Sequence, residues 1–228
     1  FEKIKLNEFD ELEQYILHKL FLIDKSFNEN LKNYNFHKLY KELLNFCTLD
    51  LSSFYFDIRK DVLYCDSIKS KKRKDCIVVL NIILECLLKW FAPILVFTTE
   101  EIFSLVDKSE NSIHEENYNS IPKKWENDKL SKKWKKLFEI KQKANIAIEE
   151  KRINKEIGSS LEADLKIQLS EKLKNLTENT DFSELCITSK AEVSYKEDIE
   201  TTAITSKAKG AKCPICWKIN EGPCPRHP

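Results

Sequence analysis

Apolar residues recur at steps of three and four positions through the first hundred residues of the chain. This period places them on one side of an α-helix, so each run predicts an amphipathic helix that buries one stripe. The first run predicts a long helix with Asn7 as its N-cap. Its stripe comprises Phe9, Leu12, Ile16, Leu20, Ile23 and Phe27.

Three more helices follow by the same pattern. Residues 36–56 and 71–91 each carry one apolar side, and the approach to Pro93 ends the later of these helices. Thr98 and Glu101 are spaced as a capping box, which predicts a short fourth helix. Four helices with short links must bury their stripes against one another, so we predict a helix bundle. The buried sides of the two middle helices are predicted to hold Leu39, Leu43, Phe46, Cys47, Leu51 and Phe54, then Cys76, Val79, Leu80, Ile83 and Leu87.

The pattern changes after the bundle. Residues 107–127 are polar and aperiodic, which predicts a linker lying over the bundle, and residues 130–154 predict a further helix that Gly158 and the serines after it end. From there apolar residues alternate with polar ones, as in half-buried strands, with a short helical segment between two such runs. These runs contain Ala163, Leu165, Ile167 and Leu169, then Ala191, Val193 and Tyr195, with Leu173 and Leu176 between them.

The last sixteen residues hold two pairs of metal-binding side chains. Cys213 and Cys216 form a C-x2-C turn, and Cys224 and His227 repeat the same step after a loop of seven residues. Three thiolates and an imidazole that converge in this way predict a closed, structural zinc site. With few apolar side chains nearby, the metal would supply about 10–16 kcal/mol of folding free energy. The alternative is a frayed tail that contains cysteines.

Together these patterns predict a mainly α fold, in which a helix bundle is followed by a small α+β domain and a C-terminal zinc knuckle. The predicted boundaries are 1–127, 128–207 and 208–228. No apolar run is long enough to span a bilayer. The remaining cysteines in helical patterns read as small core residues, so reduced thiols and a cytoplasmic setting are expected. The chain contains no Met, even at position 1, which is expected of a piece of a larger protein.

Charge is spread unevenly, although the net charge is only +1. Residues 123–155 contain twelve Lys and Arg against five Asp and Glu, a net charge of +7. Residues 156–200 contain five against eleven, a net charge of −6. A basic helix beside an acidic small domain suits an element that faces RNA, and it equally suits a solvated helix surface.

The sequence shows no catalytic constellation. With only Gly158, Gly210 and Gly222, neither a P-loop nor a dinucleotide-binding fingerprint is possible. The carboxylates Asp50, Asp57 and Asp61 lie beside cations and favour ion pairs or a polar binding surface over acid–base chemistry. We therefore predict no catalytic residue in this chain.

A binding surface is the better expectation. Residues 54–64 interleave aromatic rings with cations, and residues 69–74 add five positive charges. Rings stack on unpaired bases while Lys and Arg hold phosphates, so this mixture suits a single-stranded RNA loop. An ordinary hydrophobic helix end with flanking charge fits the same spacing. Trp217, beside Cys216, either stacks on a base or shields the metal.

Four segments, in collinear order over essentially the whole chain, resemble the bacterial isoleucyl-tRNA synthetases. The first resembles the signature of their anticodon-binding domain, and the second a segment shared by the Ile, Val, Leu and Met class I enzymes. The third resembles a later motif, and the fourth the C-terminal zinc module. The segments are Asn45 to Asp66, Ala92 to Ile102, Glu156 to Ala163, and Lys212 to Trp217.

The resemblance implies an all-α anticodon-binding bundle, then a small mixed domain whose zinc finger helps to hold the anticodon stem-loop of tRNA-Ile. It also implies a cytoplasmic, monomeric enzyme that joins isoleucine to tRNA with ATP. The sites for ATP and isoleucine would lie in an upstream catalytic domain of the same polypeptide, into which an editing domain is inserted, so this chain alone is expected to be inactive. Contacts with tRNA are implied for Asp57, Arg59, Lys60, Tyr64, Lys212 and Trp217.

One departure concerns the finger. Members of the family usually have a longer loop and a second Cys-x2-Cys pair, whereas this chain has His227 as the fourth ligand. Neutral imidazole binds zinc well, so metal binding is still expected. Two alternatives remain: the same region of a valyl or leucyl enzyme, and a free-standing zinc-knuckle adaptor that binds protein or RNA.

Overall fold

The computed structural model describes residues 1–107 and 111–227, and these divide into two compact units. The first unit comprises Phe1–Arg59 with Ser67–Asn127. The second comprises Lys60–Asp66 with the chain from Asp128 onward. A short segment from the middle of the N-terminal half is therefore part of the C-terminal unit.

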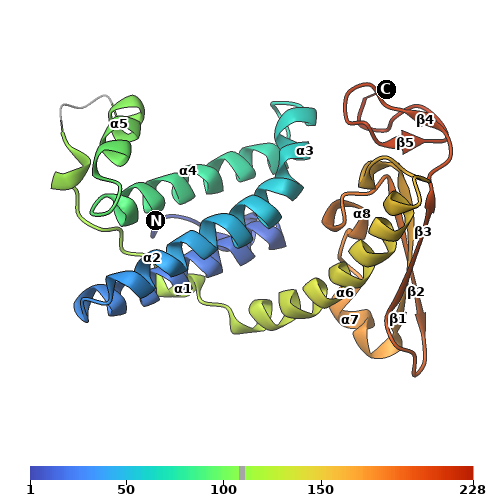
Figure 1. The fold of residues 1–228 in the computed structure, drawn as a ribbon, viewed down its shortest axis with the longest axis horizontal. Coiled ribbons are helices and arrows are strands. Elements are labelled where there is room, and N and C mark those ends of the chain that lie inside the picture. Colours follow the sequence, from blue (N-terminus) through green and yellow to red (C-terminus); the bar gives the residue numbers. More distant parts are fainter. Residues whose placement is uncertain (108–110, 228) are drawn as a thin grey trace. The chain divides into compact units, whose positions relative to one another are not determined.

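The first unit is a helix bundle, as predicted. Helix α1 packs against α2 and α4, and α4 packs against α5 (Figure 1). The predicted stripe of α1 is largely inside, with Leu12, Ile16 and Leu20 buried. The helices are α1 (Glu11–Lys32), α2 (Phe36–Asn45), η2 (Phe46–Phe56), α3 (Asp57–Cys65), α4 (Lys71–Phe91) and α5 (Val96–Val106).

The helix predicted over 36–56 differs from expectation in two ways. It continues through α3 to Cys65, and its middle section, η2, is a π-helix. A π-helix bonds residues five apart, which therefore line up. Phe46 and Leu51 are five apart and both fully buried, while Cys47 is only half-buried. The wider turn keeps the large apolar side chains facing the bundle.

Both predicted helix caps are wrong. Asn7 lies in a 3-10 turn (η1, Leu6–Glu8), and α1 begins after Asp10, whose carboxylate makes no capping bond. Helix α5 begins at Val96, so Thr98 is already inside it. Glu101, the predicted partner of Thr98, therefore does not stand in the first turn as a capping box requires, and the neighbouring Glu100 carboxylate accepts hydrogen bonds from the Ser112 hydroxyl and the Ile113 N–H. In each case the helix begins at a different residue from the one that the local pattern predicts.

The segment that follows α5 packs on the bundle, as the linker prediction proposed for 107–127, of which 108–110 lie outside the described residues. It contains two 3-10 turns, η3 (Ile113–Glu115) and η4 (Lys123–Trp125). Buried Ile113, Ile121 and Trp125 anchor it. Nothing in its polarity signals these anchors, because they are isolated apolar residues without a period.

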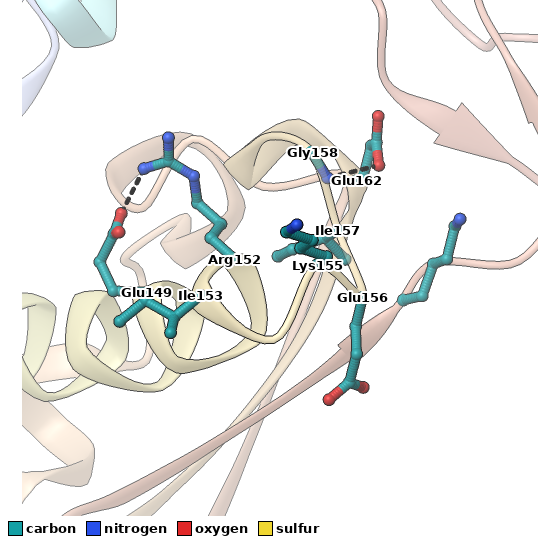
Figure 2. A pocket seen from close by; sticks show the side chains of 9 residues that line it. Glu149, Arg152, Ile153, Lys155, Glu156, Ile157, Gly158 and Glu162 are labelled. Carbon is teal, nitrogen blue, oxygen red and sulfur yellow. Dashed lines mark hydrogen bonds and ion pairs between the residues drawn. The ribbon is translucent and has the colours of Figure 1, made fainter.

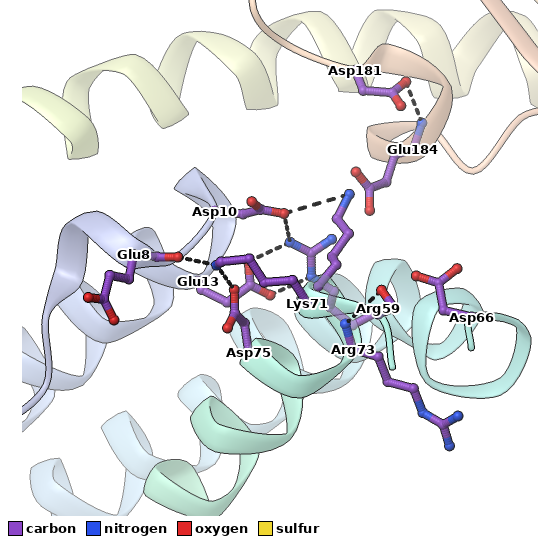
Figure 3. A network of polar contacts seen from close by, with 12 residues as sticks. Glu8, Asp10, Glu13, Arg59, Asp66, Lys71, Arg73, Asp75, Asp181 and Glu184 are labelled. Atoms are coloured by element: carbon purple, nitrogen blue, oxygen red, sulfur yellow. Dashed lines mark hydrogen bonds and ion pairs between the residues drawn. The ribbon is translucent and has the colours of Figure 1, made fainter. Parts of the chain in front are cut away.

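The bundle encloses a buried ion pair (Figure 3). The Arg59 guanidinium, 1% exposed, donates from Nε to Glu13 Oε1 and from Nη2 to Glu13 Oε2, both at 2.5 Å. The Tyr55 hydroxyl donates to the same carboxylate at 3.3 Å. Asp10, at 4.0 Å, adds a more exposed negative charge. Burial and the Glu13 charge raise the pKa of Tyr55, so its proton stays in place.

The second unit begins with the basic helix α6 (Asp128–Ile153), which packs on a three-stranded sheet. Strand β1 pairs in parallel with β2 and antiparallel with β3, giving the order β2-β1-β3. Two short helices connect β1 with β2, where one helical segment was predicted. The elements are η5 (Ser160–Glu162), β1 (Ala163–Ser170), η6 (Glu171–Leu173), α7 (Lys174–Thr177), α8 (Phe182–Leu185), β2 (Lys190–Lys196) and β3 (Thr202–Lys207).

Two details of this unit were missed. Strand β3 was not predicted, since only Ala203 and Thr205 turn inward from it. Helix α6 ends before Gly158, with Lys155 in the left-handed region at φ 57°. The Lys155 N–H donates to the Arg152 carbonyl, which closes the last turn.

The mainly α fold with a small α+β region is confirmed. Within the described residues, none of the helices is both long and apolar enough to cross a membrane.

Removing one member of the buried pair should destabilise the first unit. Glu13→Gln removes the buried carboxylate that contacts Arg59 at 2.5 Å, so we expect a loss of about 3–5 kcal/mol in the free energy of unfolding. Glu8→Gln is the control, because the Lys5–Glu8 pair is exposed and such pairs contribute about 0.5 kcal/mol. Urea denaturation followed by circular dichroism measures both. Equal, small losses would show that Arg59 is not buried.

Candidate metal centre and nucleic-acid interface

The C-terminal knuckle is a small hairpin of β4 (Ala211–Lys212) and β5 (Ile219–Asn220). The Cys213 N–H donates to the Lys218 carbonyl, and the Trp217 N–H donates to the Cys213 carbonyl. These two bonds close the turn that presents Cys213 and Cys216. Gly210 lies at φ +119°, where a Cβ would meet the Asn220 carbonyl oxygen at 2.0 Å. The hairpin therefore requires glycine at this position.

The four predicted metal ligands converge. Their donor atoms all lie within 4.8 Å of one another: Cys213, Cys216, Cys224 and His227. The Cys216 and Cys224 sulfurs are 3.7 Å apart, and His227 Nδ1 is 3.5 Å from the sulfurs of Cys213 and Cys224. A tetrahedral centre with metal–sulfur bonds of about 2.3 Å and metal–nitrogen bonds of about 2.0 Å needs separations of roughly 3.8 and 3.6 Å. The cluster fits one metal ion.

The imidazole of His227 is oriented for metal binding. Its Nε2 lies 2.8 Å from the Cys65 carbonyl oxygen, so Nε2 carries the proton and donates it. Nδ1 is then the unprotonated nitrogen, and it faces Cys213 and Cys224. A ligand histidine whose second nitrogen donates to a carbonyl is held in one tautomer and is a stronger donor.

The thiols have different proton affinities. The backbone N–H of Cys216 is the main reason that the pKa of Cys213 falls to about 6, so Cys213 is a thiolate near neutral pH. Burial raises the pKa of Cys216 to about 11. Metal binding must therefore displace a proton from Cys216, and acidification works against binding.

The knuckle is attached to the rest of the second unit at two places. The Ser189 hydroxyl accepts a hydrogen bond from the Ile219 N–H at 2.6 Å and itself donates to the Leu161 carbonyl. On its other side the knuckle contacts the segment Lys60–Asp66. The Cys65 thiol donates to the Ile215 carbonyl at 3.8 Å, and Arg226 pairs with two aspartates of this segment.

Four of the six residues expected to contact tRNA lie in the second unit: Lys60, Tyr64, Lys212 and Trp217. Lys60 and Tyr64 are four apart on α3, so they share one side of the helix, and Tyr64 is 84% exposed. The Cys65–Ile215 bond joins this helix to the loop that precedes Trp217. The structure thus gathers two exposed rings and two cations in one unit.

The other two lie in the first unit and are less accessible. Asp57 is half-buried at the start of α3. Arg59 is the guanidinium of the buried ion pair, so its charge is already compensated by Glu13. The sequence prediction treated the neighbouring cations Arg59 and Lys60 alike. Glu13, the partner of Arg59, lies 46 positions away and leaves no signal in the residues around Arg59.

Trp217 is unusual in backbone and in side chain. It lies at φ 64°, in the left-handed region, which costs a residue with a Cβ roughly 1 kcal/mol or more. Its ring is 58% exposed, and Lys212 Nζ lies 5.3 Å from the ring centroid. A large ring is thus exposed at a backbone position that glycine would adopt with less strain. The arrangement presents an aromatic plane with a cation beside it.

The motif at residues 156–163 lines a pocket of about 510 Å³ near the end of α6 (Figure 2). Its polar walls are internally paired: Arg152 bonds Glu149, and the Gly158 N–H donates to Glu162 at 2.9 Å. No catalytic nucleophile and base face each other among these lining residues. We assign the pocket no ligand.

Helix α6 also carries the basic excess that was weighed as an RNA-facing surface or a solvated helix surface. Its lysines flank a buried stripe that includes Trp134, Leu137 and Ile140.

The match to known proteins agrees with this architecture. The model of the anticodon-binding domain of tRNA ligases matches residues 13–169, and the chain belongs to that family. Among curated proteins, the isoleucine–tRNA ligase of Pelagibacter ubique is 56% identical over all of this chain. The corresponding enzymes of Bartonella quintana and Agrobacterium fabrum are 37% and 35% identical, again over all of it. The chain spans about a quarter of the length of these relatives.

The knuckle should bind one metal ion per chain. Cys213→Ser removes a thiolate and should abolish stoichiometric binding, since the site has no fifth protein ligand in the described cluster. Cys47→Ser, in the first unit, should leave the metal content unchanged. Atomic absorption after dialysis reports both. Full metal content in Cys213→Ser would rule out the four-ligand site.

Proposed function

We propose that this chain is the tRNA-recognition part of an isoleucine–tRNA ligase. The polypeptide as a whole would join isoleucine to tRNA-Ile using ATP, and the upstream domains would carry out that chemistry. Full coverage of this chain by isoleucine–tRNA ligases, at up to 56% identity among those named above, is the observation that carries the proposal. The chain alone is then inactive in aminoacylation.

The metal is proposed to be zinc, in a structural role. Three thiolates and one imidazole are the donor set of closed zinc sites, and the separations between donor atoms suit tetrahedral bonding. All four positions are taken by protein, so none is left for water or substrate. Thiolates must remain reduced to bind the ion, which supports a cytoplasmic location.

The surface that meets the anticodon loop is proposed to be formed by Lys60, Tyr64, Lys212 and Trp217. Unpaired bases stack on exposed rings, and neighbouring cations hold the phosphates. Arg59 is proposed to contribute indirectly, without touching RNA, because its ion pair with Glu13 fixes the start of α3 against α1. Asp57 is proposed as a polar neighbour of this surface at the start of α3. The ligase would work as a monomer.

Binding to tRNA tests the proposal directly. In a gel-shift assay the zinc-loaded chain should bind tRNA-Ile more tightly than the same tRNA with substituted anticodon bases. The adaptor alternative predicts equal, negligible binding to both. Family membership and the length of the relatives do not favour that alternative.

Substitutions at Trp217 separate base stacking from metal shielding. Trp217→Gly relieves the left-handed backbone and should leave zinc affinity unchanged, while tRNA binding weakens by about 1–3 kcal/mol through loss of stacking. Phe97→Ala removes an even more exposed ring from the first unit and should have no effect. Reduced zinc affinity with unchanged tRNA binding in Trp217→Gly would assign Trp217 to shielding instead.

The salt dependence of binding tests the phosphate contact. Lys60→Ala should lower the slope of log K against log salt by about 0.7–0.9, the value of one phosphate contact. Lys172→Ala removes an exposed cation that pairs with Asp198, and should leave the slope unchanged. Fluorescence anisotropy with labelled tRNA from 50 to 200 mM salt, a range typical for this effect, gives both slopes. An unchanged slope in Lys60→Ala would remove Lys60 from the surface.

A further inference from the structure

The C-terminal end of α3 is poorly stabilised by its own sequence. Its last turn contains no basic residue, and Asp61 and Asp66 bring two negative charges there. A helix C-terminus carries partial negative charge and up to four carbonyls without partners. Acidic residues at this position are unfavourable unless cations or donors reach them from elsewhere. Lys60 and Tyr64 stand on this same stretch of helix.

Arg226 and His227 supply the cation and the hydrogen-bond donor that this helix end needs. Arg226 donates from Nη1 to Asp61 Oδ2 at 2.6 Å and from Nε to Asp66 Oδ1 at 3.1 Å, and its Nη2 also reaches Asp66. The His227 imidazole donates to the carbonyl of Cys65, the last residue of α3. All of these groups are only partly exposed, so water screens the contacts incompletely.

We propose that Arg226 and His227 together form a C-terminal cap on α3, with Arg226 as a positioning residue for the RNA-binding surface. The helix does not end in the usual glycine-based motif; a side chain held by the metal cluster satisfies its last carbonyl. Through this cap the knuckle sets the position of Lys60 and Tyr64. The link to RNA rests on the proposed function, whereas the cap itself does not.

The cap couples the metal to the helix through one imidazole. His227 faces the cluster with Nδ1 and the helix with Nε2. An ion bound at Nδ1 therefore fixes the ring that caps Cys65, and an ordered helix end pre-orients the ring for the ion. Such coupling is reciprocal, so disrupting the cap should weaken metal binding and removing metal should loosen the helix end.

Arg226→Ala tests the cap in the zinc-loaded chain. Amide hydrogen exchange of residues 62–66 should become about three- to tenfold faster, the effect of losing partly screened charge-assisted bonds. Arg226→Lys keeps the charge but loses the bidentate geometry and should show a smaller acceleration. Lys172→Ala is the control for removal of one positive charge from the same unit. Zinc content is measured in each variant, so that a loss of metal is recognised.

A double-mutant cycle assigns the effect to the named contact. Asp66→Asn and Arg226→Gln should each accelerate exchange at residues 62–66, and the double variant should be little worse than either single one. Independent, multiplicative effects would show that Arg226 does not act through Asp66. Unchanged exchange in Arg226→Ala with zinc bound would overturn the cap.

Binding of tRNA-Ile separates this inference from the proposed function. If both are right, Arg226→Ala binds tRNA several-fold more weakly than the parent chain, although Arg226 itself is not a proposed contact. If the parent chain does not bind tRNA while exchange still accelerates in Arg226→Ala, the cap stands and the proposed function fails. If the parent binds tRNA and exchange is unchanged, the cap fails alone.

Discussion

The convergence of four side chains on one point is the constraint from which the C-terminal unit takes its shape. Donor atoms within 4.8 Å of one another require the hairpin, the Gly210 backbone and the left-handed Trp217 turn to hold their positions together. Because so small a segment has few apolar groups to bury, an ion held by these four side chains would supply most of its folding free energy. The exposure of Trp217 beside Lys212 follows from the same backbone geometry.

The first unit is held by different means. Apolar stripes supply most of its stabilisation, and one charge pair is enclosed within them. A buried pair contributes little net stability but makes its partners' positions specific, because any arrangement that separates them is costly. Arg59 and Glu13 thus fix η2 and α3 against α1 in a way that apolar contacts alone would not. Two neighbouring cations of one helix therefore differ in environment: Arg59 is buried in the ion pair, whereas Lys60 is exposed.

Hydrophobic periodicity was enough to predict the helices and the first two strands. The short spacing of the Cys and His residues was enough to predict that the four candidate metal ligands converge. Each depends on side chains close in sequence, whose spacing translates directly into one face or one turn. The π-helix at Phe46–Phe56 was missed because its apolar residues fit an α-helical stripe nearly as well. The caps at Asn7 and Thr98 were wrong because α1 begins after Asp10 and α5 already begins at Val96. Strand β3 was missed because only two of its residues point inward.

Non-local contacts were beyond sequence reasoning. Neither the partner of Arg59 nor the membership of Lys60–Asp66 in the second unit has any signature in neighbouring residues. Arg226 is the clearest case: between two ligands, it reads as an ordinary solubilising charge. Only three-dimensional structure shows that it reaches two aspartates more than 150 positions earlier.

That separation has a consequence for synthesis. Asp61 and Asp66 leave the ribosome 165 and 160 residues before Arg226 does. At about 5–20 residues per second, the interval is roughly ten to thirty seconds. The nascent bundle can form in this time, yet the C-terminal end of α3 must wait until Arg226 has been synthesised. Premature termination upstream of Arg226 would leave that end unfinished, whatever the state of the bundle.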